Sequence, residues 1–177
     1  HYTSQAKSWA LRGFYSTQTD CLNSGDFRGR HEVYSISKRH LSKIQSAFLQ
    51  IFSGEPWNDV WEDGQLKQYL CELAGNKNSL SFGLFDKNEL IAISLGRIKH
   101  WCSGTEYCIE EFGVIPAWQG KGIGSEFLSR IQSALLEKGI CAIILQTERS
   151  VPAYRFYKKC GFEEQTEQAF FSKYPEE

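Results

Sequence analysis

The hydrophobic residues of this 177-residue chain recur with two different spacings, and the changes of spacing divide the first half into helices and strands. Spacings of three and four predict helices over residues 41–52 and 59–73. Alternating and β-branched segments predict strands over 33–36, 81–85 and 90–98, the last two joined by the turn Asp86-Lys87-Asn88-Glu89. The first half therefore predicts two helices between a first strand and a hairpin.

The second half contains the longest predicted strand and helix. After a loop over residues 100–104, a strand from Thr105 ends before Pro116, and a glycine-rich turn leads into a helix that stops at Gly139. The apolar run of residues 140–145 predicts a strand buried on both faces. A short helix over residues 151–159, capped by Ser150 and with Pro152 in its first turn, and one or two closing strands over 162–174 complete the chain. The predicted order is β-α-α-β-β-β-α-β-α-β, an α/β (α+β) fold.

Composition indicates one compact domain of an ordinary globular protein. Hydrophobic residues make up 41% and charged residues 23%. We expect the domain to span residues 32–177, preceded by a polar N-terminal extension over residues 1–31. The net charge of −1 and the lack of a basic run argue against nucleic acid as the main partner. No apolar run approaches the roughly 20 residues that span a membrane. These features predict a cytoplasmic protein.

The cysteines do not predict a metal site. Six are present, with no C-x-x-C pair and no spacing typical of zinc ligands. We therefore expect no metal ion and no disulfide, with reduced thiols that suit the cytoplasm.

The glycine-rich turn predicts an anion-binding site. Glycines occupy alternate positions from Gly120 to Gly124 and allow a ligand to approach the backbone closely. The first N–H groups of the following helix have no partner within the helix, and the helix dipole favours a negative charge there. A turn that only reverses the chain is the alternative. The spacing matches neither of the common nucleotide-binding glycine motifs.

Two motifs resemble those of the GNAT N-acetyltransferases. Val114 to Ser125 reads V-x-P-x-x-Q-G-K-G-I-G-S, which is similar to that family's acetyl-coenzyme A signature, and Phe156 to Phe162 resembles its later tyrosine motif. The resemblance covers residues 32–173. It implies a mixed, mostly antiparallel sheet of six to seven strands with about four helices, acetyl-coenzyme A as cofactor, and a homodimer.

The same resemblance assigns residues to the cofactor. The strand ahead of the turn would pair with the pantetheine arm, and the turn would bind the diphosphate. Near residues 112–114 a backbone N–H would polarise the thioester, and Gly113 is compatible with a bulge there. The assigned residues are Phe112, Gly113, Val114, Gln119, Gly120, Lys121, Gly122, Ile123, Gly124, Ser125 and Ser150.

Three residues are candidates for acid–base catalysis. By resemblance, Tyr157 would protonate the coenzyme A thiolate; the alternative is a tyrosine that only packs its helix. Glu110 and Glu111 are adjacent carboxylates on an otherwise apolar strand, and regular alternation predicts that they point to opposite faces. The pair resembles one in spermidine/spermine N-acetyltransferases, so either could bind the amine or take its proton. One solvated and one salt-bridged carboxylate is the alternative.

The segment from Glu55 to Asp63 is the candidate wall of the acceptor pocket. It contains two tryptophans and four carboxylates, which suit a polycationic amine, with Trp57 and Asp59 as candidate contacts beside the two glutamates. Core tryptophans and an acidic helix start are the alternative.

The resulting hypothesis is an enzyme that transfers acetyl directly, in a ternary complex, to a small cationic amine of the aminoglycoside or polyamine type. An aminoglycoside acceptor would imply antibiotic resistance. Acetylation of a peptide or protein amine, and a non-catalytic domain that senses acyl-coenzyme A, are the alternatives.

Overall fold

The computed structural model describes residues 31–174, which form two compact units, residues 31–146 and residues 147–174. The first unit contains a five-stranded sheet in the order β1-β2-β3-β4-β5. Strands β1 to β4 are antiparallel to their neighbours, and β5 is parallel to β4. The strands are β1 His31–Ile36, β2 Ser79–Asp86, β3 Glu89–Trp101, β4 Gly104–Val114 and β5 Ala142–Leu145.

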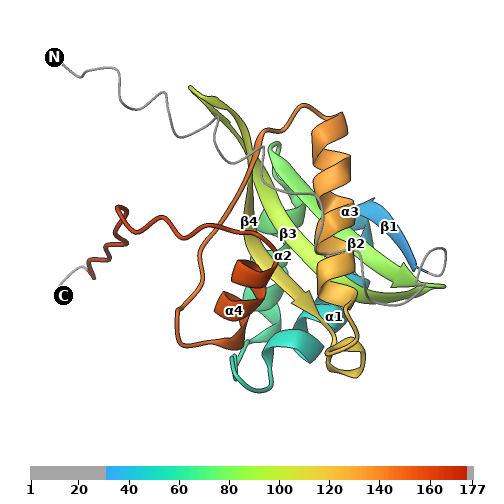
Figure 1. Cartoon of the computed structure of the whole chain (residues 1–177). Coiled ribbons are helices and arrows are strands. Elements are labelled where there is room, and N and C mark those ends of the chain that lie inside the picture. The colour runs from blue at the N-terminus through green and yellow to red at the C-terminus, as the bar shows by residue number, and fades with distance from the viewer. Residues whose placement is uncertain (1–30, 175–177) are drawn as a thin grey trace, which may run out of the picture. The chain divides into compact units, whose positions relative to one another are not determined.

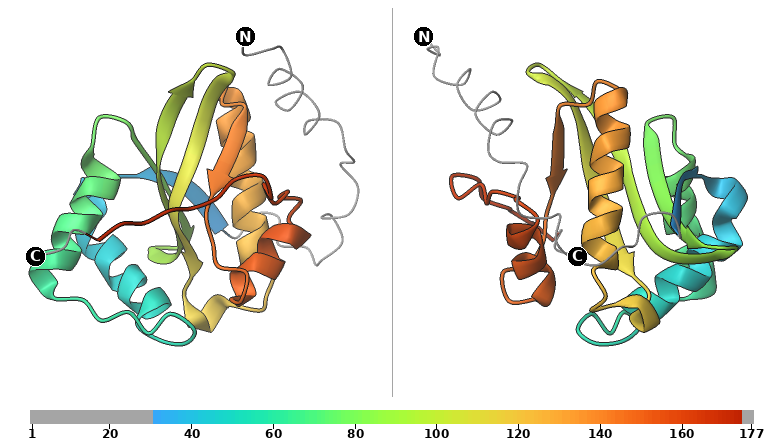
Figure 2. Two further views of the ribbon diagram at one scale, coloured as in Figure 1. Left: turned by 90° about the vertical axis from the view of Figure 1, so that its left-hand side faces the viewer. Right: turned by 45° about the vertical axis from the view of Figure 1, so that its right-hand side comes forward.

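Helices cover both faces of this sheet. Helices α1 (Leu41–Phe52) and α2 (Asp63–Gly75) lie on one face, and α3 (Ile123–Glu137) lies on the other (Figures 1 and 2). Two short 3₁₀ turns, Lys38–His40 and Pro116–Trp118, precede α1 and the glycine-rich turn. The predicted element order is thus confirmed up to the short helix after β5. None of the described helices is both long and apolar enough to cross a membrane.

The core forms where the periodic apolar residues meet the sheet. On α1 the buried side chains recur at helical spacing, as in Ile44, Phe48 and Ile51, and α3 buries Phe127 and Ile131 in the same way. Such stripes remove apolar surface from water on both faces of the sheet, which is the main favourable term in folding. The helical periods in the sequence therefore predicted these two helices and their buried faces correctly.

The second unit contains helix α4 (Pro152–Lys159) and the chain that follows it. Tyr157 is buried, and its ring packs edge-on against the rings of Phe156 and Phe162. The helix ends at Lys159 and is followed by the C-cap Cys160 and then Gly161, whose φ of 85° suits a left-handed stop. The N-cap is Val151, so the prediction that Ser150 caps this helix is wrong. Pro152 nevertheless begins the helix as predicted.

The closing strands predicted over residues 162–174 are absent from the structure, so the sheet has five strands instead of six to seven. Polar residues from Glu163 to Gln168 interrupt the apolar pattern, and Phe170 and Phe171 are 78% and 89% exposed. A segment that buries so little apolar surface gains little from becoming a strand.

Four further features differ from prediction. Strand β5 is not buried on both faces: its only neighbour in the described sheet is β4, and Ile144 is 44% exposed. Helix α2 begins at Asp63, four residues later than predicted, after Asn58 takes a positive φ of 53° that interrupts helical geometry. The loop predicted over residues 100–104 is shorter, because β3 and β4 extend to Trp101 and Gly104. His31 belongs to β1, and the rest of the predicted extension lies outside the described residues.

Candidate active site

An extra residue in β4 places the two glutamates. In the β3–β4 ladder Leu95 pairs with Glu111 and Gly96 pairs with Ile109, so Glu110 has no partner of its own. This is a β-bulge, and it reverses the alternation of side chains along the strand from that point. The bulge expected at Gly113 is therefore three residues earlier in the chain.

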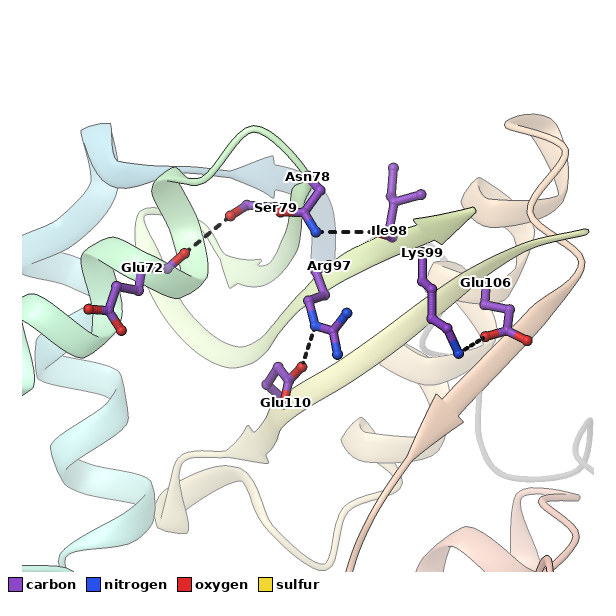
Figure 3. A network of polar contacts seen from close by, with 8 residues as sticks. All are labelled: Glu72, Asn78, Ser79, Arg97, Ile98, Lys99, Glu106 and Glu110. Atoms are coloured by element: carbon purple, nitrogen blue, oxygen red, sulfur yellow. Dashed lines mark hydrogen bonds and ion pairs between the residues drawn. The ribbon is translucent and has the colours of Figure 1, made fainter. Parts of the chain in front are cut away.

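Because of the bulge, Glu110 and Glu111 do not point to opposite faces as predicted. Glu110 accepts a hydrogen bond of 2.8 Å from Nε of Arg97 (Figure 3). Arg97 and Leu95 are two residues apart on β3, so their side chains lie on the same face of the sheet. Leu95 is the residue opposite Glu111, so Glu111 lies on that face as well. Both carboxylates thus lie on the face that α1 and α2 cover. Glu110 is exposed and salt-bridged to Arg97, which matches one half of the alternative, whereas Glu111 is partly buried and not simply solvated. Glu111 has no cationic partner among the ion pairs of the described residues.

Glu111 is held by a tyrosine from α2. The hydroxyl of Tyr69 donates a 2.6 Å hydrogen bond to Oε1 of Glu111. The pKa of Glu111 is raised to about 7, mainly by burial and also by the charges of Asp59 and Glu110, against the opposing effect of this hydrogen bond. The pKa of Tyr69 is also raised, by burial and by its bond to Glu111, so the phenol keeps its proton. A carboxyl group that titrates near neutral pH suits a general base.

Aromatic rings fix Tyr69 in place. Its ring stacks on Trp61 with centroids 5.1 Å apart, and both rings pack against Phe48 of α1. Trp61 is thus a core tryptophan, as the alternative interpretation had it, and its buried indole N–H has no hydrogen-bond partner among the described residues. Tyr69 was not identified from the sequence, because its contact with Glu111 spans 42 positions and depends on how α2 packs.

The loop between α1 and α2 lies beside this pair. Backbone N–H groups of Trp57 and Asp59 donate to the carbonyls of Gly54 and Phe52, which ties the loop to the end of α1. The Asp59 carboxylate is near enough to raise the pKa values of both Tyr69 and Glu111. A small depression beside it is lined by Asp59, Val60, Trp61 and Gln65. The structure therefore brings together Glu111 and Asp59, two of the predicted acceptor contacts.

Trp57, the aromatic acceptor candidate, is half-buried. Its ring lies 6.1 Å from that of Phe52 and packs against the hydrophobic core. The described contacts of Trp57 are thus with the core, and an acceptor contact stays a prediction.

Gly113 has a steric role that differs from a bulge. A Cβ atom at this position would lie 2.4 Å from Cγ2 of Ile51, so α1 approaches β4 more closely than any other residue would allow. This approach places the end of α1 next to the C-terminal end of β4.

Strands β4 and β5 are no longer paired at residues 112–114, where β4 is expected to pair with the pantetheine arm of the cofactor. Their pairing covers only Glu106 to Ile109 of β4. After this paired stretch, the N–H of Ile115 donates to the carbonyl of Ile91 on β3. Because successive residues of an antiparallel strand alternate between hydrogen-bonded and non-hydrogen-bonded positions, the backbone N–H and C=O of Val114 point away from β3. The Val114 carbonyl accepts a 2.8 Å hydrogen bond from the side chain of Gln119. Gln119 therefore connects the end of β4 to the glycine turn.

The glycine turn has the geometry that an anion site needs. Gly120 and Gly122 have φ values of 71° and 79°, and Gly122 is the N-cap of α3. A Cβ added to Gly120 would meet nothing within 4 Å, so the backbone there is open to a ligand. The side chain of Lys121 folds back and donates to the carbonyl of Ala117. The groups that this turn offers to an anion are therefore backbone N–H groups of the first turn of α3.

Four more of the residues predicted to bind the cofactor or to act in catalysis lie on α3, β4 and the second unit. Ile123 is buried and anchors the start of α3, and Phe112 stacks on Phe127 of that helix. Tyr157 and Ser150 belong to the second unit, and the Ser150 hydroxyl is 3.5 Å from Glu148.

No metal centre competes with this interpretation in the described part of the chain. Residues 31–174 contain no group of three or more histidine, cysteine or acidic residues that could hold a metal ion. Cys71, Cys102, Cys108 and Cys141 in that range are free thiols, and Cys21 lies outside it.

Comparison with known proteins agrees with the motifs. Residues 42–162 match the model of the acetyltransferase (GNAT) family. An aminoglycoside N(6')-acetyltransferase type 1 of Stenotrophomonas maltophilia is 28% identical over 126 residues, which cover 67% of this chain and 80% of the relative.

Solved structures share the fold at low identity. An aminoglycoside acetyltransferase from an uncultured soil metagenomic sample, solved in complex with sisomicin, has a TM-score of 0.64 at 16% identity, over 84% of this chain and 97% of the other. The acetyltransferase AAC(6')-Iy, solved with a bisubstrate analogue of coenzyme A and acetylneamine, has a TM-score of 0.65 at 18% identity, over 82% and 99%. These matches confirm the fold.

Proposed function

This chain belongs to the acetyltransferase (GNAT) family, an enzyme family that uses acetyl-coenzyme A, and we propose that its acceptor is an amine of an aminoglycoside-type molecule. The observation that carries the proposal is the half-buried Glu111 carboxyl, which is held by Tyr69 and has a pKa of about 7 beside Asp59. The aminoglycoside acetyltransferases among its relatives support this acceptor class.

Glu111 is the proposed general base. An ammonium group must lose a proton before its nitrogen can attack a thioester, and the carboxylate of Glu111 takes that proton, directly or through water. With a pKa of about 7, the carboxyl is partly ionised at neutral pH and binds a proton strongly enough to drive the transfer. Glu110 is proposed as a substrate contact only, because its charge is already paired with Arg97.

The residues of the glycine turn fit the cofactor. Open backbone at Gly120 and the first N–H groups of α3 suit a diphosphate, and the separated part of β4, residues 112–114, suits a pantetheine arm. Acetyl-coenzyme A supplies the acetyl group as a thioester when it is bound. We propose Gln119, Gly122 and Ser125 as contacts in the turn, together with the rest of the 119–125 segment, and Ser150 as a contact from the second unit.

Tyr157 is the proposed general acid. Its hydroxyl would supply the proton that the departing sulfur needs, so that coenzyme A leaves as a thiol. The aromatic packing of Tyr157 against Phe156 and Phe162 orients its ring on α4. This role rests on the family motif.

Acceptor binding is proposed to use two negative charges and one aromatic ring. Asp59 and Glu111 lie near each other and are not paired with a cation in the described contacts, so each can bind one ammonium group of a polyamino sugar. Trp57 is proposed to contact the sugar from the loop after α1. A linear polyamine is the second candidate acceptor, because it presents the same charges without rings.

The test is a thiol-release assay with acetyl-coenzyme A on four acceptor classes: aminoglycosides, linear polyamines, free amino acids and short peptides. We expect turnover on an aminoglycoside and little on the others, with Asp59→Asn raising KM for the acceptor. Turnover on peptides alone would contradict the acceptor class. Coenzyme A binding without thiol release on any amine would favour the sensor alternative.

Four expectations from the sequence stay predictions. We propose that residues 32–177 act as one catalytic domain, that it works in the cytoplasm on a small molecule, that nucleic acid is not a partner, and that the chain is a homodimer. Light scattering of the purified full chain tests the last of these.

A further inference from the structure

A carboxylate occupies the first turn of the helix that is proposed to bind the diphosphate. The backbone N–H of Glu126 closes that turn by donating to the carbonyl of Gly122, 3.0 Å away. The Glu126 side chain is only 18% exposed, so solvent screens its charge weakly. A negative charge at this point stabilises the helix by itself, but it repels an anion that binds to the same N-terminus.

Arg130 lies one helical turn later and faces this carboxylate. Its Nη2 is 2.7 Å from Oε1 of Glu126, a close ion pair without the alignment of a hydrogen bond. Its Nη1 donates a 2.8 Å hydrogen bond to the backbone carbonyl of His31. The His31 ring, fully buried at the start of β1, lies 3.3 Å from the other oxygen of Glu126. The guanidinium is therefore held by two groups and cannot swing freely into solvent.

We propose that Arg130 is a positioning residue for the cofactor: it neutralises Glu126 and thereby sets the affinity of the α3 N-terminus for the coenzyme A diphosphate. The inference rests on the proposed role of the glycine turn. It assigns a function to a side chain that lies outside the glycine motif.

A second explanation of the same contacts is purely structural. Through His31 and Glu126, Arg130 also ties β1 to α3, and loss of that tie could disturb the glycine turn without any electrostatic effect. The two explanations differ in one respect. Removing the Glu126 charge together with Arg130 restores the electrostatic balance but not the tie.

The experiment is titration calorimetry of coenzyme A with the full chain and five variants. Arg130→Gln removes the permanent positive charge beside Glu126 and should weaken binding about two- to fivefold, the size typical of one charge at a helix end. Arg130→Lys keeps the charge and should bind nearly as wild type. Glu126→Gln alone should bind at least as tightly as wild type, and the double variant Glu126→Gln/Arg130→Gln should return to the wild-type affinity.

Lys138→Gln is the matched control. It removes one positive charge from the C-terminal end of the same helix, about 22 Å away at 1.5 Å per residue. That distance exceeds two Debye lengths at physiological salt, so coenzyme A affinity should not change. Melting temperatures of all variants show whether each is folded.

Each outcome decides the proposal. Weakening by Arg130→Gln, together with recovery in the double variant, supports it. An unchanged Arg130→Gln, a double variant as weak as Arg130→Gln, or weaker binding by Glu126→Gln overturns it. If Arg130→Gln does not fold, the Glu126→Gln and Arg130→Lys results decide it alone. Failure of the wild-type chain to bind coenzyme A would instead overturn the proposed function.

Discussion

The hydroxyl of Tyr69 on α2 donates a 2.6 Å hydrogen bond to the carboxylate of Glu111 on β4. The bond joins a helix to the strand that carries the candidate base, and the Trp61 ring stacked on Tyr69 restricts the phenol. The sheet therefore places the side chain of Glu111, and the hydrogen bond from α2 orients it. This relationship leads to three of the predictions below.

The first prediction concerns the pH dependence of turnover. A general base acts when it is deprotonated, so kcat/KM should rise with pH and level off above about 7, the pKa of Glu111. Glu111→Gln should lower kcat about 10²- to 10⁴-fold and remove this rise. Steady-state kinetics between pH 5.5 and 9 measure both, and a rise that survives in Glu111→Gln would assign the base to another group.

The second prediction concerns the effect of the Tyr69 hydrogen bond on the pKa of Glu111. Tyr69→Phe removes a hydrogen bond that favours the charged carboxylate, so the pKa of Glu111 should rise and the pH profile should move to higher pH. Tyr34→Phe is the matched control, because the Tyr34 hydroxyl also donates to a glutamate, Glu32, on the exposed side of β1. Identical profiles for wild type and Tyr69→Phe would show that the hydrogen bond does not tune the base.

The third prediction is about stability. Burial raises the pKa of Glu111 from 4.5 to about 7, so the folded chain binds this proton more tightly than the unfolded chain. Stability is then lost as pH rises from about 4.5 through 7. Glu111→Gln should be more stable than wild type at pH 8, by up to about 3 kcal/mol, and the difference should vanish near pH 4.5. Urea denaturation at both pH values tests this, and a difference that does not depend on pH would contradict it.

The fourth prediction concerns the approach of α1 to β4. Gly113→Ala should destabilise the chain by roughly 1–3 kcal/mol, because the new Cβ overlaps Cγ2 of Ile51. Ile51→Ala removes that atom, so the double variant should cost less than the sum of the two single variants.

Gly64→Ala is the control for the fourth prediction. A Cβ at the exposed Gly64 of α2 meets nothing within 4 Å and should be neutral or slightly stabilising. Additive effects in the double variant, measured by urea denaturation, would show that the overlap is relieved elsewhere.

The fifth prediction tests the acid. Tyr157→Phe should leave coenzyme A affinity nearly unchanged and lower kcat, because only the proton of the hydroxyl is removed. Gly122→Val, which strains the positive φ of the N-cap and blocks the diphosphate, should instead weaken coenzyme A binding. Calorimetry and steady-state kinetics distinguish the two, and full turnover by Tyr157→Phe at saturating substrate would exclude the residue as acid.

Local patterns predicted most of the fold. Helical spacing identified α1 and α3, and the glycine turn was placed correctly because positive φ values need glycine at Gly120 and Gly122. Long-range packing was not predictable from such patterns. Within β4 no glycine or proline stands at Glu110 to mark the bulge, and the Tyr69 contact depends on the rotation of α2 about its axis. The missing final strand shows that aromatic residues alone do not create a strand without a partner to cover them.

The unpaired residue of β4 also bears on insertions and deletions. Removing Glu110 would leave Ile109 and Glu111 adjacent and still opposite Gly96 and Leu95, so every other side chain of the strand would keep its face and its partner. Removing any residue from Phe112 onward would turn the remainder of the strand over. A chain one residue shorter here could therefore keep Glu111 in place and lose only the contact with Arg97. In an alignment of relatives, a gap is tolerable at this one position of the strand.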